Sequence, residues 1–329
     1  MRRLISLNVP RKKIRVRPID ANVSPRFAQP ATFARLPHQK DLTDIDVAFV
    51  GVPFDDATSY RPGSRLGPSA VRELSRGLRT YNASLRVAPF EVVNVVDYGD
   101  VDVVPGYVQD TFERVTDVLH KVHSAGVTPL VCGGDHSISL PSLRAAHRVH
   151  GPLYVLDFDA HFDFSDSFWG KKYTHSTWVR RALEEGLISN IVELGIRGSC
   201  YSADDFRWAE ENGIEVYTMD MIEEKGYRTI LKDILGGVPQ GSPIYVSIDI
   251  DAVDPAYAPG TGAPEIGGFT GNQLLGCIRM LRGYKLVSLD VTEVSPLYDN
   301  PTGLTSILAA NVFYEAISVL ALNKSDKQG

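Results

Sequence analysis

Short apolar segments alternate with longer amphipathic segments along most of the chain, and this alternation constrains the fold more than any other feature. Almost continuously apolar runs are typical of parallel strands buried on both faces, and the segments between them have the period of helices. The predicted strands are Val47–Val52, Val92–Val96, Pro129–Cys132, Leu153–Leu156, Ile191–Leu194, Ile244–Ile248 and Lys285–Leu289. The predicted helices are Pro68–Leu78, Asp110–Ser124, Ser139–Val149, Ser176–Glu185, Ser202–Asn212, Thr270–Leu281 and Thr305–Leu320. The sequence therefore predicts a three-layer α/β/α fold with a doubly wound, mostly parallel sheet.

The chain is long for one domain, at 329 residues, but a large sheet covered on both faces can absorb that length in one core. Hydrophobic residues make up 43% and charged residues 22%, which suits a globular protein. We expect residues 1–329 to form a single domain. Residues 1–40 lack the strand and helix rhythm, so we expect them to form an irregular N-terminal arm.

Charge and composition exclude several classes of partner. The formal net charge of -6 argues against general affinity for nucleic acid. The sequence contains no run of about 18 consecutive apolar residues, so we expect no transmembrane helix. The N-terminus also lacks the apolar core of a secretory signal. Residues 1–19 are basic, with no acid before Asp20, which favours a solvated or subunit-contacting arm and leaves a targeting segment as the alternative. Three cysteines do not suit a disulfide framework, so we expect a cytoplasmic protein.

Clusters of Asp and His directly follow three of the predicted strands. They are Gly133-Gly134-Asp135-His136-Ser137, Asp157-Phe158-Asp159-Ala160-His161-Phe162-Asp163, and Ser247-Ile248-Asp249-Ile250-Asp251-Ala252-Val253-Asp254-Pro255. In parallel α/β sheets, ligand sites lie at the carboxyl ends of the strands. A lone Asp after a strand is usually a helix cap, but three such clusters together indicate a functional site.

The spacing within these clusters indicates metal binding. Residues two apart in an extended chain point to the same side, so Asp159, His161 and Asp163 can converge, as can Asp249 and Asp251. Grouped carboxylates raise one another's pKa and are costly to bury, and two divalent cations would balance four of them. Oxygen and imidazole ligands suit Mn(II), with Ni, Co, Fe and Zn as alternatives.

The clusters resemble the metal motifs of the arginase and agmatinase ureohydrolases, and the resemblance covers nearly the whole chain. Further similarity to the agmatinase and guanidinobutyrase branch lies in Val52-Pro53-Phe54-Asp55, Arg61-Pro62-Gly63, Gly195-Ile196-Arg197-Gly198-Ser199, Ala258-Pro259-Gly260-Thr261-Gly262 and Glu293-Val294-Ser295-Pro296. The resemblance implies an arginase-like fold and hydrolysis of a small guanidino compound, of the agmatine or guanidinobutyrate type, to urea and an amine.

The resemblance also implies the ligands of two ions bridged by hydroxide. One ion would be held by His136, Asp159, Asp163 and Asp249, and the other by Asp159, His161, Asp249 and Asp251. Mn(II) is the expected metal and Ni(II) the main alternative. No organic cofactor is expected.

Three residues receive catalytic roles from the same resemblance. Glu293 would bind the guanidinium by two parallel hydrogen bonds, and His175 would help to protonate the leaving amine. Asp163 would hold the hydroxide by a hydrogen bond. Asp135 and Asp254 are expected to orient ligands or cap helices rather than to bind metal.

Several positions depart from the family's usual pattern. Ser176 and Trp178 follow His175 where glycine and small residues are common, and Tyr60 stands where a smaller residue is usual. We expect these side chains to reshape the substrate pocket, with Trp178 beside its mouth. Asp157 replaces a residue that is often His, and strand alternation puts it on the same side as Asp159.

These departures leave several alternative functions. Free guanidine or a biguanide is a possible substrate, with nickel as the metal. A zinc deacetylase-like amidohydrolase would need one metal ion and a catalytic tyrosine, and a non-catalytic subunit of a ureohydrolase complex would not need intact ligands. The resemblance implies a homo-oligomer, a trimer or hexamer.

Overall fold

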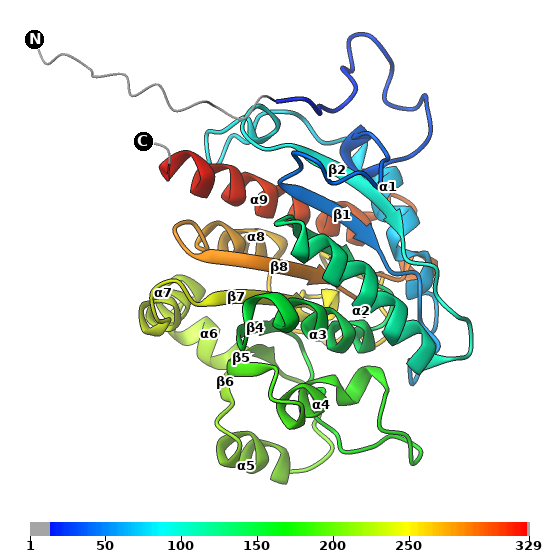
Figure 1. The fold of residues 1–329 in the computed structure, drawn as a ribbon. Coiled ribbons are helices and arrows are strands. Elements are labelled where there is room, and N and C mark those ends of the chain that lie inside the picture. Colours follow the sequence, from blue (N-terminus) through cyan, green and yellow to red (C-terminus); the bar gives the residue numbers. More distant parts are fainter. Residues whose placement is uncertain (1–13, 328–329) are drawn as a thin grey trace, which may run out of the picture.

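The computed structural model describes residues 14–327, which are built around one eight-stranded sheet (Figure 1). The strands are β1 (Val47–Gly51), β2 (Val95–Asp100), β3 (Thr128–Cys132), β4 (Leu153–Phe158), β5 (Ile188–Ile196), β6 (Glu215–Thr218), β7 (Pro243–Ile248) and β8 (Lys285–Val291). Their order across the sheet is β2-β1-β3-β8-β7-β4-β5-β6, and every pairing between them is parallel. The predicted parallel α/β sheet is confirmed.

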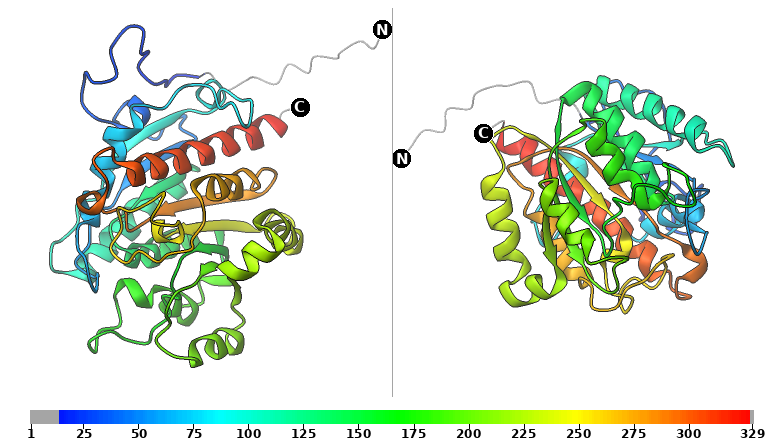
Figure 2. Two further views of the ribbon diagram at one scale, coloured as in Figure 1. Left: turned by 180° about the vertical axis from the view of Figure 1, so that it is seen from behind. Right: turned by 90° about the horizontal axis from the view of Figure 1, so that it is seen from below.

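Helices cover both faces of the sheet. On one face lie α2 (Val108–Ser124), α3 (Ser139–His150) and α4 (Trp178–Glu184), and on the other lie α1 (Gly67–Ser75), α7 (Tyr227–Gly237), α8 (Gly271–Arg279) and α9 (Leu304–Asp326) (Figures 1 and 2). The remaining helices, α5 (Asp204–Glu211) and α6 (Met219–Lys225), flank the edge strand β6. The three-layer arrangement therefore agrees with the prediction.

The central strands are buried along their whole length because helices cover both sides of them. Every residue of β4 is buried, and its sequence is apolar except at Asp157. The covering helices are amphipathic: α2 buries Phe112, Val115 and Leu119, which recur at helical spacing, and leaves its other face to solvent. Helix α8 begins with a capping box between Thr270 and Gln273.

Helix α9 is apolar on all sides, unlike the other helices. It is the one helix within residues 14–327 with the length and mean hydropathy of a membrane-spanning helix, although polar residues interrupt its apolar sequence. In the most apolar 18-residue stretch of α9, 78% is buried inside the protein. Phe313 of α9 packs edge-on against Phe49 of β1, with ring centroids 5.2 Å apart. The apolar sequence of α9 is therefore accounted for by its position in the core.

Three elements, β6, α6 and α7, were not predicted from the sequence, and the start of β2 was misplaced. The edge strand β6 is short and only partly buried, so it lacks the apolar run that marks the other strands. Helices α6 and α7 were not predicted either. Strand β2 begins three residues later than expected, because Val92 and Val93 donate their backbone N–H groups to Pro89 O at the end of the 3₁₀ helix Pro89–Glu91.

The segment before β1 has little regular structure within the described residues. Residues 14–40 contain one short 3₁₀ helix, Phe33–Arg35, and an isolated bridge from His38 to Asp97. Phe33 stacks on Phe49 with ring centroids 4.5 Å apart, which fixes this part of the arm to the domain. Much of the predicted basic stretch, from Arg2 to Lys13, lies outside the described residues.

Candidate metal centre and active site

The polar clusters follow four strands that are neighbours in the sheet, although they are far apart in the sequence. His136 follows β3, Asp159 to Asp163 follow β4, Asp249 and Asp251 follow β7, and Glu293 follows β8. Because β3, β8, β7 and β4 are adjacent and parallel, their carboxyl ends meet at one edge of the sheet. This topology brings the predicted metal ligands together.

The His136 ring lies among three carboxylates. Its Nδ1 is 3.0 Å from Asp159 Oδ2, 3.1 Å from Asp163 Oδ2 and 3.4 Å from Asp249 Oδ2. On the other side of the ring, Nε2 is 2.9 Å from Ser247 Oγ, and this hydroxyl donates to Asp290 Oδ1 at 2.9 Å. Because the Ser247 hydroxyl donates its proton to Asp290, it can only accept a hydrogen bond from His136. In the neutral ring the proton is therefore on Nε2, and Nδ1 presents a lone pair to the carboxylates.

Two of these atoms are buried without a hydrogen-bond partner among the described residues. They are His136 Nδ1 and Asp159 Oδ2. A buried lone pair next to a buried carboxylate oxygen is costly unless a cation lies between them. His136, Asp159 and Asp163 offer ligand atoms that all lie within 4.8 Å of one another, which fits one metal ion.

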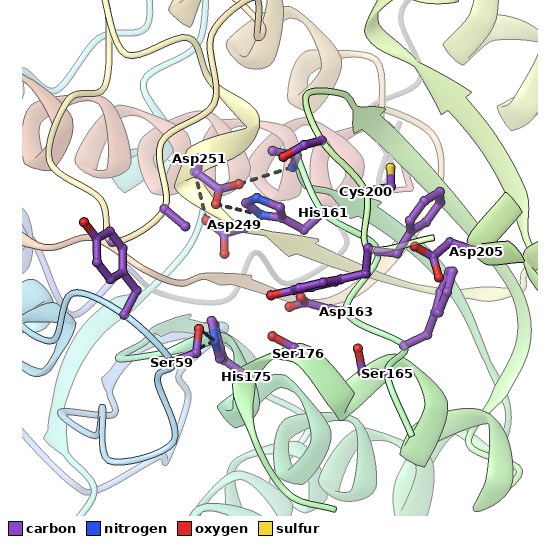
Figure 3. Close-up of a pocket in the computed structure, with 18 of the residues that line it drawn as sticks. Ser59, His161, Asp163, Ser165, His175, Ser176, Cys200, Asp205, Asp249 and Asp251 are labelled. Atoms are coloured by element: carbon purple, nitrogen blue, oxygen red, sulfur yellow. Dashed lines mark hydrogen bonds and ion pairs between the residues drawn. The ribbon is translucent and has the colours of Figure 1, made fainter. Parts of the chain in front are cut away.

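A second group shares Asp159 with the first. His161 Nδ1 lies 3.2 Å from Asp251 Oδ2 (Figure 3). It also lies 3.5 Å from Asp159 Oδ1, and Asp159, His161 and Asp251 have ligand atoms within 4.8 Å of one another. Backbone groups orient the carboxylates: His161 N donates to Asp159 Oδ1 at 2.6 Å, and Asp251 N to Asp249 Oδ1 at 2.8 Å. The donor set is oxygen and imidazole throughout, which suits a hard or borderline divalent metal.

Electrostatics also favours cations at this position. Burial and repulsion from Asp251 raise the pKa of Asp249 well above its usual range. Burial and the Asp159 charge likewise raise the pKa of Asp163. A divalent ion offsets such repulsion and keeps the carboxylates ionised, so the residues at this edge fit a metal centre.

Glu293 and His175 lie next to the predicted metal ligands. Glu293 has a left-handed backbone, with φ of 59°, and its Oε1 accepts the backbone N–H of His136 at 3.0 Å. His175 Nδ1 lies 3.4 Å from the same Oε1. Burial alone would lower the pKa of His175, but the Glu293 carboxylate outweighs it and raises the pKa to about 9. The ion pair with Glu293 therefore favours the charged form of the ring.

A cavity of about 370 Å³ opens onto this site, and Figure 3 shows its lining. Its inner end includes His161, Asp163, His175, Asp249, Asp251 and Glu293. Ser176 and Tyr60, which were predicted to shape the pocket, also line it, and Tyr60 is 68% exposed. The cavity therefore connects solvent with four of the six predicted ligands and with Glu293 and His175.

The predicted position of Trp178 at the pocket mouth is wrong. Its side chain is 1% exposed, does not line the cavity, and packs against the His136 ring with centroids 4.9 Å apart. The cause is the short 3₁₀ helix His175–Thr177, which precedes α4 and directs Trp178 into the core. Trp178 therefore packs against the ring of His136, a predicted metal ligand.

Asp135 and Asp254 occupy supporting positions. Asp135 caps the 3₁₀ helix that begins at His136 by accepting Ser137 N at 3.0 Å, and it also accepts Ala57 N at 2.9 Å. Asp254 accepts backbone N–H groups of Ala256 and Gly267 and so shapes its loop. Neither belongs to the groups of ligand atoms described above.

Sequence reasoning singled out Asp157 but missed two further buried acids behind the cluster, Glu193 and Asp290. Asp157 Oδ1 lies 3.8 Å from His136 Nε2, and Asp157 is paired in register with Glu193 of β5. Both side chains are fully buried, and burial followed by their mutual repulsion raises the pKa of Glu193 well above its usual range. Asp290 of β8 accepts hydrogen bonds from Ser139, Ser247 and Tyr245. Each of Glu193 and Asp290 is an acid within a mostly apolar strand, and this feature of the sequence could have indicated a buried functional or structural role.

Comparison with known proteins identifies the family. The arginase family model matches residues 45–318. The chain belongs to the arginase family. It is 41% identical over 308 residues to the guanidinobutyrase of Pseudomonas aeruginosa and 45% identical over 307 residues to the guanidinopropionase of the same organism; each alignment covers 92% of this chain and 96% of the relative.

A solved structure supports the same assignment for the fold. The proclavaminate amidinohydrolase of Streptomyces clavuligerus superposes with a TM-score of 0.86 at 40% identity, covering 91% of this arginase-family chain and 100% of that chain. The predicted ureohydrolase resemblance and the arginase-like fold are confirmed.

Proposed function

We propose that this arginase-family protein is a metal-dependent amidinohydrolase that cleaves a small guanidino compound to urea and an amine. One observation carries the proposal: Glu293, His175 and four of the six proposed ligands line a single solvent-connected cavity, the four being His161, Asp163, Asp249 and Asp251. The names of its relatives, guanidinobutyrase and guanidinopropionase, agree with this reaction class.

The proposed ligands are those implied by the resemblance to the ureohydrolases, with Asp159 and Asp249 shared by two ions. His136 and Asp163 would complete one ion's set, and His161 and Asp251 the other's. Bound divalent ions lower the pKa of coordinated water toward neutrality and so supply hydroxide for attack on the guanidinium carbon. Mn(II) is the proposed metal and Ni(II) the main alternative.

Glu293 is proposed to bind the substrate's guanidinium. A carboxylate accepts two parallel N–H bonds from a guanidinium plane, which fixes the direction from which the carbon is approached. One of its oxygens, Oε1, is held by the backbone N–H of His136, so the carboxylate has a defined orientation toward the metal ligands.

His175 is proposed to hold the proton that the leaving amine takes. Its Nδ1 lies 3.4 Å from the carboxylate that would bind the guanidinium, and this ion pair outweighs burial, raises the pKa of His175 to about 9 and so favours the charged ring. When the C–N bond breaks, this proton converts the departing nitrogen into a neutral amine. Asp163 is proposed to accept a hydrogen bond from the attacking water.

Substrate identity is proposed at the level of a compact guanidino compound. A guanidino acid is favoured by the names of the relatives. Free guanidine or a biguanide is the alternative, because Tyr60 and Ser176 line the cavity and depart from the pattern usual in the family. Trp178 no longer supports that alternative, since it lies in the core.

The test is release of urea, or of its substituted analogue, from agmatine, 4-guanidinobutanoate, 3-guanidinopropionate, arginine, free guanidine and a dimethylbiguanide. Each compound is assayed with protein loaded separately with manganese and nickel. Turnover of one compound with either metal supports the proposal and selects the substrate. No product from any compound with either metal contradicts it.

We also propose that the protein is a single-domain, cytoplasmic homo-oligomer, a trimer or hexamer by resemblance to its family. Three free cysteines, two of them buried, suit a reducing compartment. Light scattering after size-exclusion chromatography measures the oligomeric state, and a monomer at micromolar concentration contradicts this part of the proposal.

A further inference from the structure

Three hydrogen bonds join the His175 residue to the segment Ala57–Ser59. The backbone N–H of His175 donates to Ala57 O at 3.1 Å. The backbone N–H of Ser59 lies 3.1 Å from His175 Nε2, and Ser59 Oγ lies 2.7 Å from the same nitrogen (Figure 3). The outer nitrogen of the imidazole is therefore held by a single residue, Ser59.

The backbone bond determines where the neutral ring carries its proton. A backbone N–H can only donate, so Nε2 must offer a lone pair to the Ser59 amide. The ring proton is then on Nδ1, the nitrogen that lies 3.4 Å from Glu293 Oε1. In the neutral ring, the proton thus points at the proposed substrate position rather than away from it.

The Ser59 hydroxyl supports the charged ring as well. A hydroxyl can donate to a bare Nε2 or accept from a protonated one, so it remains a partner in both protonation states of His175. An alanine at this position would keep the backbone N–H and lose this adaptable partner.

The segment that carries Ser59 is itself fixed from the metal side. The fully buried Asp135 accepts Ala57 N at 2.9 Å, and the next residue, His136, donates its backbone N–H to Glu293. Hydrogen bonds thus link Asp135 to Ala57 and Ala57 to His175, and an ion pair links His175 to Glu293. Glu293 in turn accepts the backbone N–H of His136, the residue after Asp135. The His175 ring is therefore held relative to both the metal ligands and Glu293.

We propose that Ser59 is a positioning residue that sets the orientation and protonation site of His175. This inference rests on the proposed function for its kinetic consequence, but not for its structural one. It assigns Ser59 no contact with the substrate.

The kinetic test compares Ser59→Ala and Ser59→Thr with the parent protein on whichever guanidino compound the parent hydrolyses. For Ser59→Ala we expect kcat to fall about tenfold with little change in KM or metal content, because one hydrogen bond to the charged ring is lost. The basic limb of the kcat profile should move to lower pH, because the imidazolium loses an acceptor. Ser59→Thr should restore both quantities.

Ser165→Ala is the matched control, because Ser165 lines the same cavity and its side chain makes no hydrogen bond within residues 14–327. Its pH profile should match that of the parent. An unchanged kcat and pH profile in Ser59→Ala overturns the inference, as does an equal change in Ser165→Ala.

A second measurement does not depend on turnover. The ¹⁵N chemical shifts of the His175 ring, recorded on zinc-loaded protein, report which nitrogen carries the proton. We expect a protonated Nδ1 in the parent at high pH, and a lower His175 pKa in Ser59→Ala. A neutral ring protonated at Nε2 overturns the inference even if the parent hydrolyses none of the compounds, a result that would contradict the proposed function alone.

Discussion

Glu293 Oε1 accepts the backbone N–H of His136 at 3.0 Å, so the acid proposed to bind the guanidinium is bonded to the residue whose ring faces the metal-binding carboxylates. These residues are 157 positions apart in the sequence and meet because β3 and β8 are adjacent strands. The distance between the proposed guanidinium site and the proposed metal centre would thereby be set by the backbone of the sheet rather than by flexible side chains.

Replacing Asp249 by Ala should empty the metal centre. Its carboxylate is proposed to be shared by both ions, so its loss leaves each set of ligands incomplete. We expect less than one tightly bound metal per chain and a fall in activity of more than about 100-fold. Metal content is measured by mass spectrometry after gel filtration. Asp254→Ala is the control, and an Asp249→Ala protein with full metal content would rule out the shared-ligand role.

Replacing Glu293 by Gln should separate metal binding from turnover. The amide oxygen can still accept the His136 N–H, so the loop should keep its structure, but the charge that binds the guanidinium is lost. We expect unchanged metal content and kcat/KM reduced by roughly 100-fold or more. Steady-state kinetics on metal-saturated protein make the test. Activity close to that of the parent would mean that another residue orients the substrate.

Replacing Trp178 by Ala should destabilise the fold without broadening the substrate range. The indole is 1% exposed and packs on the His136 ring, so its truncation leaves a cavity in the core. We expect a loss of about 3–5 kcal/mol in the free energy of unfolding and a smaller loss for Trp178→Phe. Urea denaturation gives the energies. A stable variant with a changed substrate profile would show that Trp178 shapes the substrate pocket after all.

Stability should fall as the pH drops below about 6.5, in part because of His123. Burial, followed by the neighbouring His150 and His120, lowers the pKa of His123 from 6.5 to about 3. The unfolded chain therefore binds a proton in this range that the folded chain does not, so acidification favours unfolding. Between pH 7.5 and 5.0 this group alone contributes about 2 kcal/mol.

The variant His123→Phe tests that contribution, because it keeps a ring against His150 but cannot be protonated. Its free energy of unfolding should decline less between those two pH values than that of the parent. The same decline in both proteins would show that other groups control acid stability.

Sequence reasoning succeeded where the evidence was local. Strands buried on both faces give apolar runs, and Asp159, His161 and Asp163 follow such a run at spacings of two, so both the sheet and the ligand clusters could be predicted. The edge strand β6 could not, because its burial is partial and its composition mixed. The position of Trp178 depends on how the turn before α4 is wound, which no periodicity reveals.

Residues that act through long-range contacts were harder to find. Ser59 reaches His175 across 116 positions, and Glu193 meets Asp157 only because β4 and β5 pair in register. Each is an unremarkable polar residue in its own segment. Their roles follow from strand order, which the alternation of strands and helices does not specify.

Strand β8 is the last to be synthesised, yet it lies between β3 and β7 at the middle of the sheet. Until residues 285–291 have left the ribosome, the two halves of the sheet have no common neighbour to join them. The ligands from β3 and those from β4 and β7 then belong to separate parts of the nascent chain. Metal capture and sheet closure should therefore be late, coupled events in biogenesis, with the final strand acting as the step that commits the chain to its native state.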